Sequence, residues 1–409
     1  MNNQQLRIAF LSNQISWGGG AKSLLLLIRT LDKQYYKLYL FVTNCSSDEM
    51  KKEYEQYVEF VKIVNLPEIT SATTQLLKHN KQKVNENKLD LANVESFADE
   101  LTHLGIDILH INNSVFSAVY KTIRCRTNVK IVSHIREWIA WNGIHKKQKY
   151  IISSIKDNSD AIICISDTEA QVFKQHPNLF VIPNPFDFQE LEFIEMNKDI
   201  IKSKLALDEN CFLVGMMGRT RNKGTLDFLK TLVYIKSNYK DMTSIKFILI
   251  GEEIHPSPGK FLFFLREVLG KSTYLYDVHN FIKKENLFNE VIFLNKRKNV
   301  LEIINCFDIA VRPSYSGDPW GRDIIEYMAL RKPIVATGSS EFFIKNGETG
   351  FLVPSRDYIK LAESIYWLYK NKKARLQMGE RAYERIYARC NMNEFRQNLL
   401  QVYDTLKQS

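Results

Sequence analysis

Short apolar runs, rich in β-branched residues, alternate with longer helical patterns along this chain. Such alternation is typical of a parallel sheet with helices packed on its faces. In the first half we predict strands at residues 6–12, 37–43, 62–65, 108–111, 130–134, 161–165 and 180–182, with helices such as 22–31 and 94–104 between them. Residues 70–90 are polar and rich in Lys and Asn, so we expect them to form a mobile surface excursion.

The pattern starts again after a connector that contains Pro183 and Pro185. Two prolines this close exclude both a helix and a central strand. In the second half we predict strands at 212–216, 246–250, 291–294, 309–312, 334–336 and 350–353, and helices at 225–234, 323–330 and 392–406. Residues 255–279, which include the apolar run 261–265, look like an insertion.

A chain of 409 residues exceeds the size at which one hydrophobic core suffices. We therefore predict an α/β protein with two Rossmann-like, doubly wound domains that face each other across a cleft. The expected boundaries are 1–185 and 186–390, with the C-terminal helix 391–409 crossing back to pack on the first domain. Ligands of open parallel sheets bind at the carboxyl ends of the strands, so we expect the site between the domains.

The composition limits the partners and the compartment. The chain is 45% hydrophobic and 25% charged, as globular proteins are. Its net charge of +10 suits nucleic acid, an anionic membrane surface or a phosphorylated substrate. The basic residues are spread along the chain without a recognisable nucleic-acid-binding module, so we expect no nucleic acid partner. The charge says nothing of the oligomeric state.

The six cysteines are scattered without a C-x-x-C pair or a His cluster. This pattern indicates neither a zinc site nor a disulfide framework, and it favours the reducing cytoplasm. The N-terminal residues do not form a signal segment, and no run reaches the roughly 20 apolar residues that a membrane span needs. We expect a soluble protein, or one that lies against a membrane.

A glycine-flanked basic loop, residues 218–224, follows the strand predicted at 212–216 and precedes a helix. Gly218 and Gly224 allow tight turns, Arg219 can engage phosphate oxygens with two N–H groups, and Lys223 can act as a point charge. The alternative is an ordinary solvated basic loop. The acidic motif downstream favours the phosphate-binding interpretation.

That motif places two carboxylates, Asp318 and Glu326, eight positions apart around a Pro-Trp-Gly turn. Asp318 is expected on the loop and Glu326 about a turn into the helix, facing inward. Gly321 lets backbone N–H groups approach a ligand, and an anionic diphosphate belongs at the helix start. A lone Glu on a helix would be a surface residue, and a Glu facing the cleft can accept hydrogen bonds from both ribose hydroxyls.

Three features of the first half are candidates for binding. Gly18 to Gly20 form either a flexible turn or a backbone that approaches the diphosphate or the acceptor, beside Trp17. His134 follows a strand and either faces the cleft or is a structural histidine, as His110 is expected to be. Lys146, Lys147 and Lys149 lie near Trp138 and Trp141, and they form either a solvated helix face or a contact with anionic membrane.

Together these residues resemble the retaining glycosyltransferases of family 4. The resemblance covers almost all of the second half and is looser in the first. In the first half it rests on Gly18 to Ala21, Asp107 to His110 and Ser133 to Glu137. In the second half and the connector it rests on Pro183 to Asp187, Arg219, Lys223, Gly251 with Glu252, Arg312 to Ser314, Asp318 to Gly321, Glu326 to Ala329, Lys332 to Val335 and Asn346 to Val353.

The resemblance implies a GT-B fold in which the C-terminal domain holds the donor and the N-terminal domain holds the acceptor. Arg219 and Lys223 would bind the diphosphate, Glu326 the ribose and Asp318 the transferred sugar, with His134 near that sugar. The implied catalytic set is Asp318, His134, Arg219 and Lys223, and the implied donor-binding set is Gly19, Gly20, Gly218, Arg219, Lys223, Gly251, Trp320, Gly321, Arg322 and Glu326.

The chain departs from the family pattern in two places. The first acid is Asp318 rather than Glu, which shortens its reach by one methylene, and the spacing from Arg219 to Lys223 is one residue tighter than is common. These departures bear most on the identity of the donor sugar. There is no D-x-D pair, so we expect no metal cofactor, because basic residues and helix N-termini can stabilise the leaving phosphate.

The function expected from these residues is retaining transfer of a sugar from a UDP- or GDP-sugar to a saccharide or lipid-linked acceptor, in the synthesis of cell-surface polysaccharide or glycolipid. The protein would work in the cytoplasm, with peripheral contact at the inner face of the membrane. Two alternatives stay open. One is a nucleotide-sugar-binding subunit without catalysis, which the Asp318 departure motivates, and the other is a GT-B nucleotide-sugar epimerase.

Overall fold

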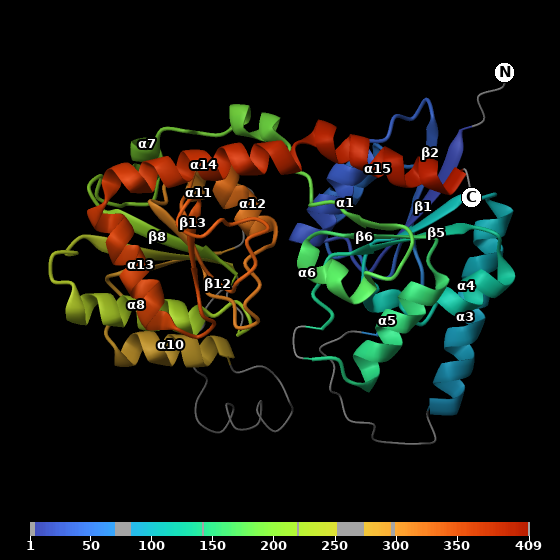
Figure 1. The fold of residues 1–409 in the computed structure, drawn as a ribbon, viewed down its shortest axis with the longest axis horizontal. Helices are drawn as coiled ribbons and strands as arrows, with labels where there is room; N and C mark the ends of the chain where they lie inside the picture. Colours follow the sequence, from blue (N-terminus) through green and yellow to red (C-terminus); the bar gives the residue numbers. More distant parts are fainter. Residues whose placement is uncertain are drawn as a thin grey trace. The chain divides into compact units, whose positions relative to one another are not determined.

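The computed structural model describes residues 5–69, 83–140, 143–218, 221–251, 274–295 and 299–407. The chain forms two compact units, each an α/β sandwich (Figure 1). The first unit contains residues 1–186 together with 390–409, and the second contains residues 187–389. The connector Pro183 to Pro185 therefore ends the first segment of the first unit.

The first unit is built on a parallel sheet with the strand order β3-β2-β1-β4-β5-β6-β7. Its strands are β1 (Leu6–Ser12), β2 (Tyr36–Val42), β3 (Val61–Ile63), β4 (Ile108–Ile111), β5 (Lys130–Ile135), β6 (Ala161–Cys164) and β7 (Leu179–Val181). Its α-helices are α1 (Gly19–Arg29), α2 (Asp48–Glu55), α3 (Lys83–His103), α4 (Tyr120–Arg126), α5 (Lys146–Asn158), α6 (Asp167–Ala170) and α15 (Met392–Lys407). Two 3-10 turns, Ser114–Phe116 and Gln171–Phe173, complete the unit.

The second unit is built on a parallel sheet with the strand order β10-β9-β8-β11-β12-β13. Its strands are β8 (Phe212–Met217), β9 (Ile245–Gly251), β10 (Val291–Asn295), β11 (Ile309–Arg312), β12 (Ile334–Thr337) and β13 (Gly350–Val353). Its helices include α7 (Lys198–Lys204), α8 (Thr225–Asn238), α10 (Tyr274–Lys284), α11 (Val300–Asn305), α12 (Arg322–Ala329), α13 (Tyr358–Lys370) and α14 (Lys372–Cys390), after a 3-10 turn at Phe188–Phe193.

Both sheets reverse their strand order at one point. In the first unit the chain moves outward from β1 to β3 and then returns to the other side of β1 with β4. In the second unit β8 and β11 are related in the same way. Ligands bind at such a switch point, beyond the carboxyl ends of the strands. The fold therefore points to the residues that follow β1 and β4 in one unit, and β8 and β11 in the other.

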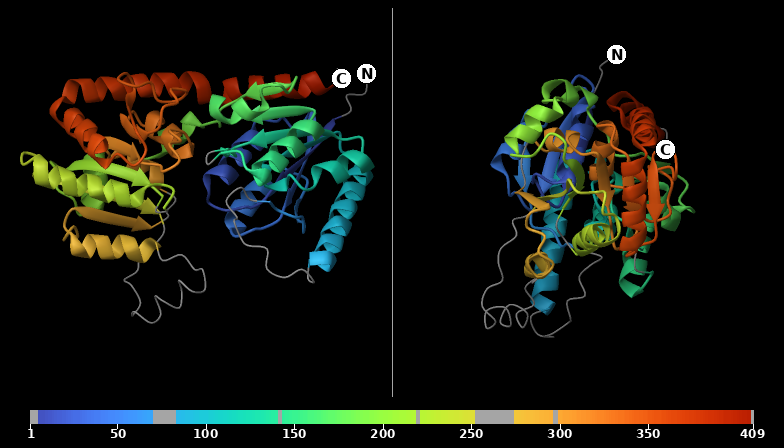
Figure 2. Two further views of the ribbon diagram at one scale, coloured as in Figure 1. Left: turned by 60° about the horizontal axis from the view of Figure 1, so that its bottom comes forward. Right: turned by 90° about the vertical axis from the view of Figure 1, so that its left-hand side faces the viewer.

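Both faces of the first sheet are covered, which explains why its strands are apolar on both faces. Ala9 and Leu11 of β1 pack in a core with residues of α3, α4 and α5. Ile8 and Phe10, which point the other way, pack with residues of α1, α2 and α15. The left view of Figure 2 shows helices on the two faces of this sheet.

The C-terminal helix α15 belongs to the first unit, although the chain reaches it only after completing the second (Figure 1). Its buried residues recur at helical spacing and pack on β1, β2 and β4 together with α1. These residues are Phe395, Leu399, Val402, Tyr403 and Leu406. The helix thus closes one of the two cores of the first unit.

The strands lie within two residues of the ranges predicted from sequence, and the differences concern helix starts. Helix α1 begins at Gly19 rather than at residue 22, so Gly19 and Gly20 lie in its first turn after the N-cap Gly18. Helix α3 begins at Lys83, which corrects the expectation that 83–90 belong to a surface excursion. The remainder of that segment, 70–82, lies outside the described residues.

The insertion predicted at 255–279 is only partly described. Residues 274–279 form the start of α10, and Tyr274 and Val278 pack in the core of the second unit. The apolar run 261–265 lies outside the described residues. What is described is therefore an ordinary part of the α/β unit.

Candidate functional site

The loop after β8 is held tightly against the end of β11. Gly224, the N-cap of α8, has a φ of 76°, and a Cβ at this position would lie 1.7 Å from the carbonyl oxygen of Pro313. Only glycine fits such a backbone contact. The backbone N–H of Tyr315 donates to the carbonyl of Asn222 at 2.9 Å. The two loops at the switch point of the second unit are thus joined directly.

Gly218 and Lys223 from this loop are described, whereas Arg219 lies outside the described residues. Gly218 follows β8 with a φ of 88°, and its N–H donates to the carbonyl of Ile250 at 2.7 Å. Gly251, the next residue, ends β9. The Nζ of Lys223 lies 3.3 Å from Oδ2 of Asp323, so the structure brings Lys223 to the first turn of α12.

Arg312, the last residue of β11, is the centre of the site. It is buried, and its guanidinium contacts two carboxylates at once. Nη1 donates to both carboxylate oxygens of Asp323, at 2.6 Å to Oδ1, and Nη2 donates to Oδ2 of Asp318 at 2.6 Å. Nε donates to the backbone carbonyl of Asp318 at 2.7 Å. This planar fork fixes both the acidic loop and the start of α12 relative to β11.

The charges of this cluster stabilise one another. Burial opposes the charge of Arg312, but Asp323 and Asp318 outweigh it and hold the pKa of Arg312 above its ordinary value. Burial would raise the pKa of both carboxyls, but Arg312 lowers them below their usual range. For Lys223, burial and the nearby Arg312 lower the pKa, and Asp323 opposes this shift. The carboxylates are therefore ionised, and Lys223 sits beside a fixed positive charge.

Asp318 is oriented by its own loop. Its Oδ1 accepts hydrogen bonds from the hydroxyls of Ser314 and Ser316, and its Oδ2 accepts from Arg312. Its side chain is 21% exposed. A carboxylate can accept about four hydrogen bonds, so one acceptor position on Oδ2 is not used by the described residues.

Helix α12 carries the second acid of the motif. Glu326 is buried, and its Oε1 lies 3.1 Å from Nε of Arg322, one turn earlier. The next residue, Tyr327, accepts a hydrogen bond at its hydroxyl from the N–H of Met217 at 2.8 Å. This contact places the middle of α12 at the carboxyl end of β8. The structure thus groups Lys223, Asp318 and Glu326 at one end of one sheet.

Gly321 and Trp320 shape the turn between the two acids. A Cβ at Gly321 would lie 2.7 Å from Oδ1 of Asp323 and 3.1 Å from Nη1 of Arg312, and its φ is 138°. Only glycine leaves room for this buried ion pair beside the helix start. Trp320 is buried as well, with 4% of its surface exposed.

Asp323 and Arg312 were assigned no role from sequence, although both form the framework of the site. A signal for Arg312 was present, because a charged residue that ends a fully apolar strand must find partners when it is buried. Asp323 carried a weaker signal, since an acid in the first turn of a helix is common.

The first unit has a polar cavity at the equivalent edge of its own sheet. It has a volume of about 310 Å³. Its polar lining comes from the residues that follow β1, β4 and β5, and Gly20 and Ala21 from the first turn of α1 add to it. The lining polar side chains are those of Ser12, Asn13, Gln14, Asn112, Asn113, Arg136 and Glu137.

The two charged side chains of this cavity are tied to neighbours. Arg136 donates from Nε to Oδ1 of Asn112 at 2.8 Å and from Nη1 to Oδ1 of Asn184 in the proline connector. Glu137 accepts from the N–H of Ser114 at 2.8 Å and from its hydroxyl. No role was predicted for Arg136, Asn112 or Asn113, although polar residues directly after two neighbouring parallel strands are a signal for a site.

His134 does not line this cavity. Its side chain is fully buried within the sheet face that α1 and α15 cover, next to His110. Arg136, two residues further along, is the side chain at this strand end that lines the cavity. This burial is compatible with a structural histidine, and the role of His134 near the transferred sugar stays a prediction.

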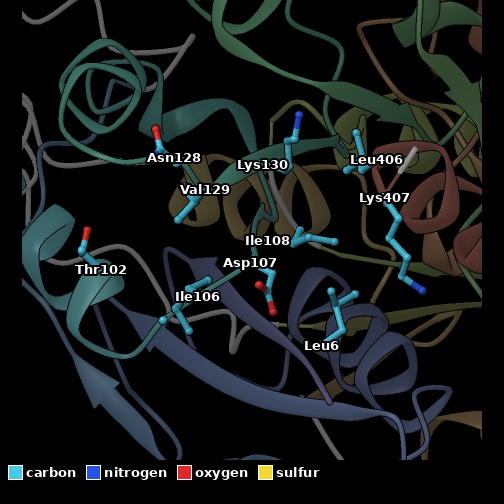
Figure 3. A pocket seen from close by; sticks show the side chains of 11 residues that line it. Leu6, Thr102, Ile106, Asp107, Ile108, Asn128, Val129, Lys130, Leu406 and Lys407 are labelled. Carbon is cyan, nitrogen blue, oxygen red and sulfur yellow. The ribbon is translucent and has the colours of Figure 1, made fainter. Parts of the chain in front are cut away.

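A larger cavity, of about 540 Å³, lies at the opposite ends of the same strands (Figure 3). It is lined by Leu6, Ile108 and Lys130, the first residues of β1, β4 and β5, and by Leu406 and Lys407 of α15. Ligands of parallel sheets bind at the carboxyl ends instead. None of the residues singled out from sequence as site candidates lines this cavity.

Within the described residues, no group of three or more His, Cys, Asp or Glu side chains has a geometry that could hold a metal ion. The described helices also include none that is long and apolar enough to cross a membrane.

Two Rossmann-like sheets, each with polar groups at its switch point, are the architecture of the GT-B fold, which many glycosyltransferases share. Comparison with known proteins agrees with this class. The family model described as Glycosyltransferase Family 4 matches residues 17–190, and the model described as Glycosyl transferases group 1 matches residues 197–385. Together the two models span most of the chain, and the chain belongs to the group 1 glycosyltransferases.

Solved structures and curated relatives point the same way. The Anabaena protein HepE, in complex with UDP and glucose, matches 98% of this chain and all of its own, with a TM-score of 0.75 and 19% identity. The N-acetyl-alpha-D-glucosaminyl L-malate synthase of Bacillus anthracis is 22% identical over 78% of each chain. The capsular polysaccharide biosynthesis glycosyltransferase CapM of Staphylococcus aureus is 24% identical over 55% of this chain and 54% of its own.

Replacing Arg312 should strongly destabilise the second unit. Arg312→Met leaves the buried Asp323 and the partly exposed Asp318 without their main partner, so we expect the free energy of unfolding to fall by about 3–5 kcal/mol. Denaturant unfolding of the variant measures this loss. As a control, Lys370→Met breaks an exposed pair with Asp241 and should change the free energy of unfolding far less, because water screens that pair. Equal losses in the two variants would contradict the central role of Arg312.

Acid should weaken the first unit before it affects the site of the second. Burial, then Arg136, lowers the pKa of His110 from 6.5 to about 3 and that of His134 well below its usual range. Below about pH 6.5 the unfolded chain then binds more protons than the folded chain, so the free energy of unfolding falls by up to about 1.4 kcal/mol per pH unit for each histidine. Asp318 and Asp323, with lowered pKa values, contribute only below about pH 4.

Urea midpoints measured at pH 7, 6 and 5 test this expectation. We expect the midpoint to decrease at each step. A constant midpoint over this range would mean that the two histidines are protonated to the same extent in the folded and unfolded chain.

Proposed function

We propose that this glycosyltransferase is a retaining enzyme that moves a sugar from a UDP- or GDP-sugar to a saccharide or lipid-linked acceptor, in the synthesis of a cell-surface polysaccharide or glycolipid. The observation that carries the proposal is the grouping of Lys223, Asp318 and Glu326 at the switch point of the second unit, where Asp318 pairs with Arg312, Lys223 with Asp323 and Glu326 with Arg322. The UDP and glucose in the HepE complex and the capsular role of CapM support it.

The start of α12 suits the diphosphate of the donor. Its N-cap is Gly321, which offers no side-chain cap, and the positive end of the helix dipole lies at this turn. Lys223 lies at this helix start and adds a positive charge, and Arg219 would add a second. The remaining residues assigned to the donor are Gly218, Gly251, Trp320 and Arg322 in the second unit and Gly19 and Gly20 in the first.

Glu326 would accept hydrogen bonds from the ribose hydroxyls, and Asp318 would accept one from the transferred sugar. For Asp318, the unused acceptor position on Oδ2 and the partial exposure of the side chain support the role. Arg312 and the two serines hold its carboxylate in place, so no reorganisation is needed when the sugar binds.

The proposed transfer reaction needs few protein groups beyond those that bind the donor. The bond from the anomeric carbon to the diphosphate breaks, and a bond to the acceptor oxygen forms on the same face. The acceptor proton passes to the leaving diphosphate. Lys223, Arg219 and the helix N–H groups stabilise the charge that develops on that leaving group, and no metal is required.

The cavity of the first unit is suited to the acceptor. Three Asn and one Gln line it, and amide side chains both donate to and accept from sugar hydroxyls. The charges of Arg136 and Glu137 are held by neighbouring side chains and backbone groups. A polyhydroxylated acceptor fits this lining.

Loss of the charge at Glu326 should weaken donor binding. Glu326→Gln keeps the side-chain volume, and we expect the donor KM or Kd to rise about 10- to 100-fold, the worth of charged hydrogen bonds of about 1.5–3 kcal/mol. The control for this variant is Glu348→Gln, which changes an exposed residue of the same unit.

A thermal-shift panel of UDP-glucose, UDP-N-acetylglucosamine and GDP-mannose identifies the donor, because a ligand at about 100 times its Kd stabilises the fold by roughly 2.7 kcal/mol.

The thermal-shift panel, together with activity assays, also distinguishes the transferase from the two alternative functions. No shift with any nucleotide sugar would refute the donor site. Binding without turnover, together with activity gained by Asp318→Glu, would instead indicate a binding subunit. Donor isomerisation without an acceptor would indicate an epimerase. If the transferred sugar has the same anomeric configuration in the product as in the donor, the enzyme is retaining.

The start of α5 supports a peripheral membrane contact at the cytoplasmic face. Ile144 and Tyr150 are 49% and 48% exposed, and Lys146 and Lys149 are exposed beside them. Lys147 and Trp138 are half-buried, and Trp141 lies outside the described residues. Apolar side chains among lysines suit the surface of an anionic bilayer.

Neutralising this patch should reduce binding to anionic vesicles. Replacing Lys146, Lys147 and Lys149 with Gln removes about 1 kcal/mol each, so we expect at least about tenfold less cosedimentation with vesicles of phosphatidylcholine and phosphatidylglycerol. The control replaces the exposed Lys52, Lys121 and Lys174, which carry the same total charge. Equal losses in both variants, or equal binding to pure phosphatidylcholine, would refute a localised contact.

A further inference from the structure

A chain of buried hydrogen bonds leads from helix α15 across the first sheet. The hydroxyl of Tyr403 lies 2.8 Å from Nδ1 of His110, in β4. Nε2 of His110 lies 3.1 Å from Nδ1 of His134, in β5. Nη2 of Arg136 lies 3.3 Å from that same Nδ1. Tyr403, His110 and His134 are fully buried.

The arginine sets the direction of every bond in this chain. A guanidinium only donates, so Nδ1 of His134 accepts and the proton of this neutral ring is on Nε2. His110 must then donate from its Nε2, and its Nδ1 accepts from the hydroxyl of Tyr403. Each tautomer is therefore determined by the group beside it. Burial and the charge of Arg136 keep both rings neutral by lowering their pKa values.

The ring of His110 packs against the aromatic rings around it. His110 lies 5.2 Å from Phe10, 5.3 Å from His134 and 6.0 Å from Tyr403 between ring centroids. Nε2 of His134 is buried and finds no hydrogen-bond partner among the described residues. Among the described residues, only the contacts at Nδ1 therefore keep the proton of His134 on Nε2.

The other end of the chain reaches the polar cavity. Arg136 lines the cavity, and its Nε holds Asn112, a second lining residue, at 2.8 Å. Asn184 accepts from its Nη1. His134 is thus one of the side chains that contact Arg136, and Arg136 in turn holds Asn112.

We propose that Tyr403, on the C-terminal helix, is a positioning residue for the polar cavity: through His110 and His134 it fixes Arg136 and Asn112 in the cavity wall. The proposal rests on the proposed function in one respect, that the cavity holds the acceptor. Without the Tyr403 hydroxyl, Nδ1 of His110 loses its hydrogen-bond donor. The His110 ring is then free to turn or shift, and the contacts from His110 to His134 and from His134 to Arg136 loosen.

Tyr403→Phe tests the proposal, because it keeps the ring and removes the hydroxyl. The matched control is Tyr120→Phe. The Tyr120 hydroxyl is equally buried and lies 2.7 Å from Oγ of Ser133, the residue before His134, but its ring packs in the core on the opposite face of the sheet. Each variant loses one buried hydroxyl contact, but only the hydroxyl of Tyr403 contacts a histidine.

Nitrogen NMR of protein labelled at His and Arg reports on these hydrogen bonds without any ligand. In the unchanged protein and in Tyr120→Phe we expect His110 and His134 to be neutral with Nε2 protonated, and the Nε–H of Arg136 to be protected from exchange. In Tyr403→Phe we expect the nitrogen shifts of His110 and His134 to change, because the His110 ring loses its contact at Nδ1, and the Arg136 signal to exchange faster. Unchanged histidine and arginine signals in Tyr403→Phe would overturn the proposal.

Kinetics with UDP-glucose as donor and D-glucose as acceptor give the second readout. We expect Tyr403→Phe to raise the acceptor KM about fivefold, the effect of one neutral hydrogen bond, with the donor KM unchanged. An equal rise in Tyr120→Phe would show a general effect of destabilisation and would also overturn the proposal. If the enzyme transfers no sugar at all, the proposed function fails, and the NMR signals still decide whether Tyr403 positions Arg136.

Discussion

The contact of Arg312 with Asp318 and Asp323 is the interaction on which the site of the second unit depends. A guanidinium buried at the end of an apolar strand needs acceptors, and it finds them on the loop and on the helix that follow. The same contact requires Gly321, because a side chain there would meet the ion pair. One buried charge thus explains the glycine, the position of the first acid and the direction in which α12 begins.

Much of the fold could be predicted because parallel strands covered on both faces leave continuous apolar runs. All of the predicted strand ranges coincide with observed strands to within two residues. The start of α1 was harder to predict, because three consecutive glycines have little helix propensity and only the packing of the following leucines keeps Gly19 and Gly20 in the helix. The early start of α3 was missed for a similar reason, since residues 83–90 read as polar.

The site could be predicted only in part. Spacing identified Asp318, Gly321, Glu326 and Lys223, which the structure brings to one end of one sheet. It could not show that both oxygens of Asp318 are held by neighbours, or that Asp323 is the carboxylate closest to Lys223. His134 shows the same limit. A residue at a strand end faces one side of the sheet or the other, and the identity of the covering helix, here α15, decides whether it is buried.

The position of α15 also has a consequence for the order of folding. The second unit is one continuous stretch of chain, residues 187–389, whereas the first unit needs residues from both ends of the sequence. A ribosome releases residues 395–406 only after the whole of the second unit, and until then one face of the first sheet lacks the helix that covers it. The first unit, although synthesised first, therefore completes its core last, and a nascent chain exposes the apolar surface around Phe10 and Leu38 until translation has passed the second unit.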